Sequence, residues 1–294
     1  MEEKHFGPVW FIPAENRGKY PYCHSVYVEG PGIIIDPASD RQRLSELREE
    51  PGVQEVWLSH WHEDHFMHLD LFEDLPFLIC ERDVPPLQDE DTFIAWYGID
   101  NPDFIAYWRK ALKEQFNYRP RTPSDIFTGG EVIERDGITV DVISTPGHTP
   151  GHLAFFFRGP EVLFMGDYDL GKFGPWYGDR DADIDQTIES VNRLRQIPAR
   201  TWITGHEFGL FEDEPGEAWD RYLNVIDERE NKLLAFLTEP RTMQEIVEQW
   251  IIYRKPREPR GFFEFGERAL MGKHIERLMK KGEVIEKENG YVKN

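Results

Sequence analysis

The stretch Ser59-His60-Trp61-His62-Glu63-Asp64-His65 holds three histidines and one aspartate between positions 60 and 65. Imidazole nitrogens and carboxylate oxygens are ligands of first-row transition metals. Residues two apart in extended backbone point the same way, so His60 and His62 can reach one ion together. A turn after Glu63 can aim Asp64 and His65 at a second ion. The alternative is a solvated polar turn, which the chain's 10 His in 294 residues make a poor explanation.

Three later residues are candidates for the remaining ligands. His148 ends Thr145-Pro146-Gly147-His148, a tight loop after a predicted strand. Asp167 and His206 each follow a short apolar strand and a glycine. Each is weak evidence alone, because Gly-Asp and Gly-His occur at many ordinary turns. Together with the first cluster, they favour a site for two ions.

The composition allows one large domain and a small one, with 39% hydrophobic and 14% aromatic residues. The formal charge is −21. Residues 241–294 carry 12 Lys or Arg and nine Glu, hence +3, which leaves −24 for residues 1–240. An acidic body repels nucleic-acid backbones and anionic membranes at long range, although a role in solubility explains the charge better.

The two cysteines, Cys23 and Cys80, show no disulfide framework, which fits a reducing compartment. The first residues lack the pattern of a signal peptide, and no run of about 18 apolar residues is present. We therefore expect a cytoplasmic protein without a membrane partner.

Short β-rich runs alternate with helical patterns along most of the chain. Predicted strands lie at 25–28, 33–35, 55–58, 75–80, 138–144, 153–157, 161–165 and 200–204. Predicted helices lie at 40–50, 102–116, 183–195 and 216–237. The aromatic segment 85–121 is either an insertion that covers one side of the site or a plainly packed helix. This pattern predicts an α+β fold of sheets packed face to face, with helices outside.

The last part of the chain has its own pattern. Thr242-Met243-Gln244-Glu245 is a capping box that starts a helix. A second helix is expected over 266–281, and Asn289-Gly290 predicts a hairpin turn. Two helices and a two-stranded hairpin outline a winged helix. We therefore divide the chain into a catalytic domain, 1–237, and a winged-helix-like domain, 238–294.

The histidine cluster, the TPGH loop, Gly166-Asp167 and Gly205-His206 occur in the order typical of the metallo-β-lactamase superfamily, which residues 20–210 resemble. The resemblance implies a four-layer αβ/βα sandwich with a metal site at one edge of its two sheets. By the family pattern, one ion is held by His60, His62 and His148. The other is held by Asp64, His65 and His206, and Asp167 bridges the two. Asp36 resembles a residue that supports the site by orienting a ligand, although a role in capping or in a turn fits it as well.

Two branches of the superfamily are similar to this chain. The run Thr145–His152 resembles the glyoxalase II-like branch, whereas the tail resembles a branch that includes endoribonucleases. Two departures leave the substrate open: Phe66-Met67-His68 replaces a frequent pair of glycines, and the loop Tyr168–Tyr177 matches no known pocket.

The expected function is a dinuclear metal-dependent hydrolase that uses a metal-bridging hydroxide. The donors admit Zn, which we expect, as well as Fe or Mn. Asp64 is the candidate for carrying a proton to the leaving group. The first interpretation is a hydrolase of a small ester, thioester or lactone. The alternative is a phosphodiesterase or endoribonuclease that acts on single-stranded nucleic acid.

Two further interpretations are weaker. A winged-helix nucleic-acid binder does not need the intact ligand set, and a mononuclear-iron persulfide oxygenase needs only part of it. His68, His152, Tyr168 and Tyr177 are open between donating to a substrate oxyanion and packing. The expected partner is a small-molecule substrate, and the chain is compatible with a homodimer.

Overall fold

The first of two main sheets brings together the N-terminal part of the chain. The computed structural model describes residues 1–294. Seven strands follow one another in chain order; β1 to β4 pair antiparallel and β4 to β7 pair parallel. They are β1 (Lys4–Phe6), β2 (Val9–Ile12), β3 (Ser25–Val28), β4 (Ile33–Ile35), β5 (Glu55–Trp57), β6 (Phe77–Cys80) and β7 (Asp125–Phe127).

The second sheet contains six strands in the order β13-β12-β11-β10-β9-β8. Only β11 and β12 pair parallel, so their carboxyl ends point the same way. The strands are β8 (Val132–Arg135), β9 (Ile138–Ser144), β10 (Leu153–Phe157), β11 (Val162–Phe164), β12 (Thr201–Ile203) and β13 (Leu210–Phe211).

The two sheets pack face to face over a cluster of 18 buried residues. Trp57 of the first sheet lies 5.3 Å from Phe155 of the second, measured between ring centroids. Burial on both faces explains why strands such as Ile33–Ile35 are apolar at every position.

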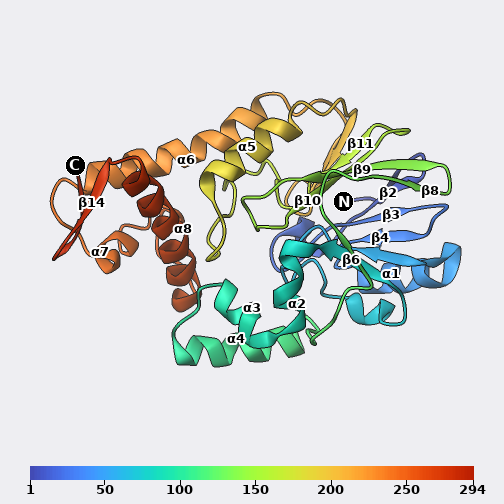
Figure 1. Ribbon diagram of the computed structural model, residues 1–294, viewed down its shortest axis with the longest axis horizontal. Helices are drawn as coiled ribbons and strands as arrows, with labels where there is room; N and C mark the ends of the chain where they lie inside the picture. The colour runs from blue at the N-terminus through green and yellow to red at the C-terminus, as the bar shows by residue number, and fades with distance from the viewer.

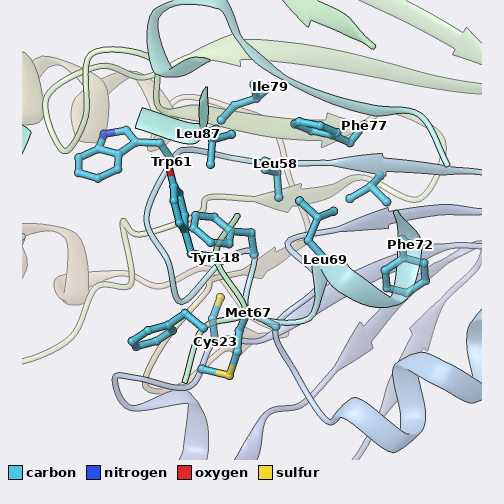
Figure 2. Close-up of a cluster of buried hydrophobic side chains, with 14 of the residues drawn as sticks. Cys23, Leu58, Trp61, Met67, Leu69, Phe72, Phe77, Ile79, Leu87 and Tyr118 are labelled. Carbon is cyan, nitrogen blue, oxygen red and sulfur yellow. The ribbon is translucent and has the colours of Figure 1, made fainter. Parts of the chain in front are cut away.

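Helices cover the outer face of each sheet (Figure 1). A cluster of 26 buried residues joins the first sheet to α1 and to the 84–118 segment (Figure 2). A cluster of 12 joins the second sheet to α5 and α6. The helices are α1 (Arg41–Leu47), α2 (Val84–Gln88), α3 (Glu90–Trp96), α4 (Pro102–Glu114), α5 (Ile184–Leu194) and α6 (Glu217–Phe236). The predicted sandwich of two sheets between helices is therefore confirmed.

The tail consists of two helices and a two-stranded sheet. They are α7 (Met243–Val247), α8 (Arg260–Lys280), β14 (Val284–Lys287) and β15 (Gly290–Lys293). The capping box of Thr242 and Glu245 is present as predicted. The predicted start of the second helix at Gly266 is wrong, because α8 begins at Arg260, directly after Pro259. Gly266 is instead an interior residue, at a position where a Cβ would collide with the Tyr253 side chain.

Hydrophobic contacts cross the proposed boundary at 237/238. One buried cluster contains Ile226 and Leu233 of α6 together with Leu270 and Ile275 of α8. Figure 1 shows the tail beside the far end of α6, away from the sheets. The tail therefore packs on α6, and the division into two domains stays a prediction. None of the helices is long and apolar enough to cross a membrane.

Candidate metal centre

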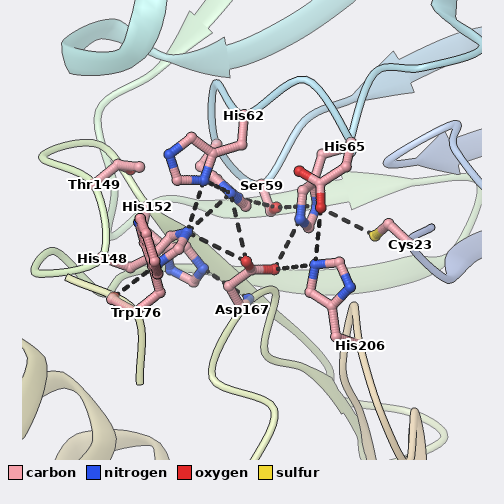
Figure 3. A network of polar contacts seen from close by, with 12 residues as sticks. Cys23, Ser59, His62, His65, His148, Thr149, His152, Asp167, Trp176 and His206 are labelled. Atoms are coloured by element: carbon pink, nitrogen blue, oxygen red, sulfur yellow. Dashed lines mark hydrogen bonds and ion pairs between the residues drawn. The ribbon is translucent and has the colours of Figure 1, made fainter. Parts of the chain in front are cut away.

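The candidate ligands come together where the strands that precede them end, and Figure 3 shows His62, His65, His148, Asp167 and His206 gathered around one place. His60 follows β5, His148 follows β9, and Asp167 and His206 follow the parallel strands β11 and β12. Strands β9, β11 and β12 run in the same direction, so their carboxyl ends meet at one edge of the second sheet and bring these side chains together. All seven candidates lie in this region, and each side chain is at most 13% exposed.

One group of donors surrounds a single point. His60 Nε2 lies 3.0 Å from His62 Nδ1, and His148 Nε2 lies 3.1 Å and 3.0 Å from these two atoms. One Asp167 oxygen, Oδ2, is 3.3 Å from His148 Nε2. These four residues form one potential metal site.

The contacts in this group fit a bound cation. Each of these three imidazole nitrogens lies about 3 Å from the other two. Protons on the rings can satisfy only some of these contacts, so the remaining lone pairs repel one another. Nitrogen ligands that bind one ion at about 2.0–2.1 Å also lie about 3 Å from one another, as these three nitrogens do. Burial lowers the pKa of His60 well below its usual value and that of His148 to about 4, which keeps both rings neutral and able to bind a metal.

A second group lies beside the first and shares Asp167 with it. The other carboxylate oxygen, Asp167 Oδ1, is 2.8 Å from His65 Nε2 and 3.3 Å from His206 Nε2. Asp64 Oδ2 is also 3.3 Å from His206 Nε2. Because each Asp167 oxygen faces a different group, the carboxylate has the geometry of a bridge between two ions.

Cys23 is a residue of this region that the sequence did not single out. Cys23, His65 and His206 form a potential metal-binding group. The sulfur lies 3.4 Å from His65 Nδ1, the nitrogen that faces Asp36, whereas Asp64 faces His206 Nε2, on the side of Asp167. Burial raises the pKa of the Cys23 thiol to about 11. We therefore retain Asp64 as the third ligand of the second ion.

Acceptors behind the imidazoles fix which nitrogen faces the site. Asp36 Oδ2 lies 2.8 Å from His65 Nδ1, and its Oδ1 accepts the Ser59 backbone N–H. Asp36 also has a positive φ of 50° at the turn after β4, so it serves both roles expected for it. His206 Nδ1 donates to the carbonyl of Gly18 at 2.6 Å. Such contacts set the tautomer and direction of a ligand ring.

The loop beyond Asp167, which matched no known pocket, orients two further ligands. Asp179 Oδ2 lies 2.7 Å from His62 Nε2, and His148 Nδ1 lies 3.0 Å from the carbonyl of Trp176. Burial opposes a charge on His62, but Asp179 outweighs it and raises the pKa to about 9. A metal ion must displace the second proton of this ring, so affinity for metal falls as the pH decreases.

The four residues with open roles all have protein partners. His152 Nε2 accepts the backbone N–H of Asp167 at 3.1 Å, and Tyr168 donates to the carbonyl of Thr145. Tyr177 contacts His274 of α8 at 2.9 Å, and His68 Nδ1 lies 3.3 Å from an Arg41 nitrogen. Their partners favour packing and support over donation to a substrate.

The model of the metallo-beta-lactamase superfamily matches residues 19–206. The chain belongs to this superfamily. The protein is therefore a metal-dependent hydrolase. Several other proteins are similar to it in sequence or in fold.

Several curated proteins are similar to this chain in sequence. The lactamase-like protein nscB of Trichophyton rubrum is 28% identical over 154 residues, 51% of this chain and 46% of that protein. The hydroxyacylglutathione hydrolase of Hyphomonas neptunium is 28% identical over 194 residues, 64% of this chain and 62% of that protein. The chain thus spans about half the length of the curated relatives it matches.

One solved structure is similar in fold to nearly the whole of this chain, including the tail. A metallo-beta-lactamase family protein from Thermus thermophilus has a TM-score of 0.75 at 22% identity, covering 98% of this chain and 99% of that one. This comparison establishes the metallo-beta-lactamase fold and does not bear on the substrate.

Removal of a ligand should change the metal content. We expect about two ions per chain in the wild type and about one in His206→Ala, since the second site then loses an imidazole and keeps only Asp64, His65 and the shared Asp167. Elemental analysis after dialysis measures this directly. His68→Ala is the matched control, because His68 lies against Arg41, and it should retain both ions. A full complement in His206→Ala would contradict the assignment of the second site.

The support from Asp36 is testable with a substitution of nearly equal shape. Asp36→Asn keeps a residue type that tolerates a positive φ but removes the charge behind His65. We expect metal affinity to fall by about 10–100-fold, measured by competition with a chelator. Asp70→Asn, which alters a carboxylate paired with Arg41, should leave the affinity unchanged.

Proposed function

We propose that this metal-dependent hydrolase cleaves a small ester, thioester or lactone. The observation that carries the proposal is the pair of donor groups joined by Asp167, whose two oxygens face different groups. One curated relative, 23% identical over 192 residues, is named an atrochrysone carboxyl ACP thioesterase. That name, together with the hydroxyacylglutathione hydrolase above, supports an acyl substrate.

The protein supplies a rigid and largely dry frame for the reaction. When bound, two divalent ions would acidify a water molecule and polarise the substrate carbonyl. The imidazoles are held in place by Asp36, Asp179 and the Trp176 carbonyl, so little reorganisation accompanies the reaction. The Tyr97 ring stacks on His62 at 5.5 Å, and its hydroxyl donates to Glu63. The aromatic segment thus closes one side of the site against water.

Asp64 is the residue that we propose to move a proton. Its side chain is 5% exposed and lies beside His206, next to the shared Asp167. From there the carboxylate can take up a proton and return it to the leaving group.

The tail gives a nuclease role little support. Several of its basic side chains are neutralised by carboxylates: Arg260 pairs with Glu264, and Arg277 pairs with Asp185. The −24 body would also repel a nucleic acid. A small-molecule partner is therefore our proposal, in preference to a single-stranded nucleic acid.

Four further assignments rest on the sequence. We propose zinc as the native metal, because nitrogen and carboxylate ligands suit it. The tail is proposed to be a winged helix, since α8 and the β14–β15 hairpin follow one another as in that motif. A cytoplasmic location and a homodimer complete the proposal.

A substrate panel tests the reaction class. The metal-loaded protein is assayed with p-nitrophenyl butyrate, a thioester, a lactone and bis-p-nitrophenyl phosphate. We expect the highest kcat/KM on one of the three acyl substrates, and a complete loss of turnover after the metal is chelated. His68→Ala should behave as the wild type. Preferential cleavage of the phosphodiester would instead establish the alternative function.

Replacement of Asp64 tests the proton transfer. Asp64→Asn keeps an oxygen ligand but cannot carry a proton, so kcat should fall by about 10²–10⁴-fold on the best acyl substrate. Metal content is measured on the same preparation. Asp74→Asn, at an exposed carboxylate paired with Arg48, is the control. Full turnover at full metal content in Asp64→Asn would rule out this role.

A further inference from the structure

A basic cavity lies between the loop after Asp167, helix α6 and the tail, with a volume of about 220 Å³. Five cationic side chains line it: Lys172, Arg229, Lys232, Arg254 and Arg257. Glu228 is the one carboxylate in the lining. Apolar groups complete the walls, including the ring of Phe173, which is 39% exposed. The cavity therefore combines a strong positive charge with apolar surface, in a protein whose net charge is −21.

These five cations lack the ion pairs that other basic residues form. No carboxylate oxygen lies within 4.0 Å of the charged nitrogens of any of the five. In the same tail, Arg241, Arg260 and Arg277 each have a carboxylate partner. Like charges gathered around one cavity repel one another, and an anion within it removes that repulsion.

Arg229 makes the strongest case, because its guanidinium is buried and unpaired. The residue is 3% exposed, and its nitrogens donate to the Tyr177 hydroxyl at 2.8 Å and the Phe173 carbonyl at 2.6 Å, both neutral acceptors. The nearby carboxylate of Glu267 accepts instead from the backbone N–H groups of Ile252 and Tyr253. Buried charges in proteins are normally paired, so Arg229 favours an anionic ligand at this place.

The cavity and the metal centre share one loop. Arg229 holds the loop at the Phe173 carbonyl, and three residues later the Trp176 carbonyl accepts from the ligand His148. The Cα atoms of Phe173 and Trp176 are thus at most about 11 Å apart. The loop therefore connects the cavity to the metal centre, so a group bound against Phe173 can affect the ligands through the loop or belong to an extended substrate.

We propose that this cavity binds the phosphate group of a small molecule that also has an apolar part. Several cations suit a multiply charged phosphate, and guanidinium groups bind its oxygens in pairs. The Arg229 and Arg257 groups are already held over aromatic rings, at 4.9 Å from Phe173 and 5.8 Å from Tyr253, so binding requires little ordering. The volume of about 220 Å³ suits a phosphate group with a small apolar part beside it.

Binding of inorganic phosphate to the metal-loaded protein tests the proposal by calorimetry. The test variant is Lys232→Gln with Arg257→Gln, two cavity cations outside the metal centre. The control is Lys255→Gln with Lys287→Gln, which removes the same charge outside the cavity lining. We expect the control to match the wild type and the test variant to have a Kd raised by roughly tenfold or more. The same Kd in all three proteins would place the phosphate on the metal ions or the surface and overturn the proposal, as would an absence of binding.

Kinetics then identify where the phosphate comes from, and only this arm rests on the proposed hydrolase function. The substrates are butyryl-coenzyme A, which bears phosphates, and the uncharged p-nitrophenyl butyrate. If the bound phosphate belongs to the substrate, the test variant should have a raised KM for butyryl-coenzyme A and an unchanged KM for p-nitrophenyl butyrate. A separate effector predicts that added phosphate changes turnover of the second substrate in the wild type and not in the test variant. Because the binding measurement needs no turnover, failure of the hydrolase function would leave the site intact.

Discussion

The arrangement depends on one constraint: five imidazoles and two carboxylates must be held within a few ångströms of one another in a buried site. Two ring nitrogens that both lack a proton repel at about 3 Å, and buried carboxylates are costly unless a positive charge faces them. The fold meets this cost with acceptors behind the rings, such as Asp36 and Asp179, and with the cations that the donors are arranged to bind. The two sheets provide the rigidity, since each ligand follows a strand fixed by the shared core.

Much of the site could be predicted because its chemistry is local in sequence. The cluster from His60 to His65 carries four of the seven ligands, and His148, Asp167 and His206 each follow an apolar strand and a turn. Short strands and capped helices likewise have local patterns, so the sandwich was predictable. The match to the superfamily model confirms the family, and the assignment of individual ligands stays a prediction.

The parts that could not be predicted depend on contacts between distant segments. Trp176 contributes a backbone carbonyl, which no residue type reveals, and Asp179 reaches His62 across 117 positions. Cys23 lies near His65 only because β3 and β5 belong to one sheet. The start of α8 was predicted wrongly because a glycine is typical of a helix boundary. Gly266 instead lies inside the helix, where close packing on Tyr253 requires a glycine.

The position of Asp167 has a consequence for how the enzyme is assembled. A single carboxylate serves both groups, and the Asp167 backbone N–H is fixed by His152. No other candidate ligand has oxygens that face both groups, so neither group is complete without this residue. The two sites are thus linked through one side chain, and a substitution at Asp167 would disturb both of them at once.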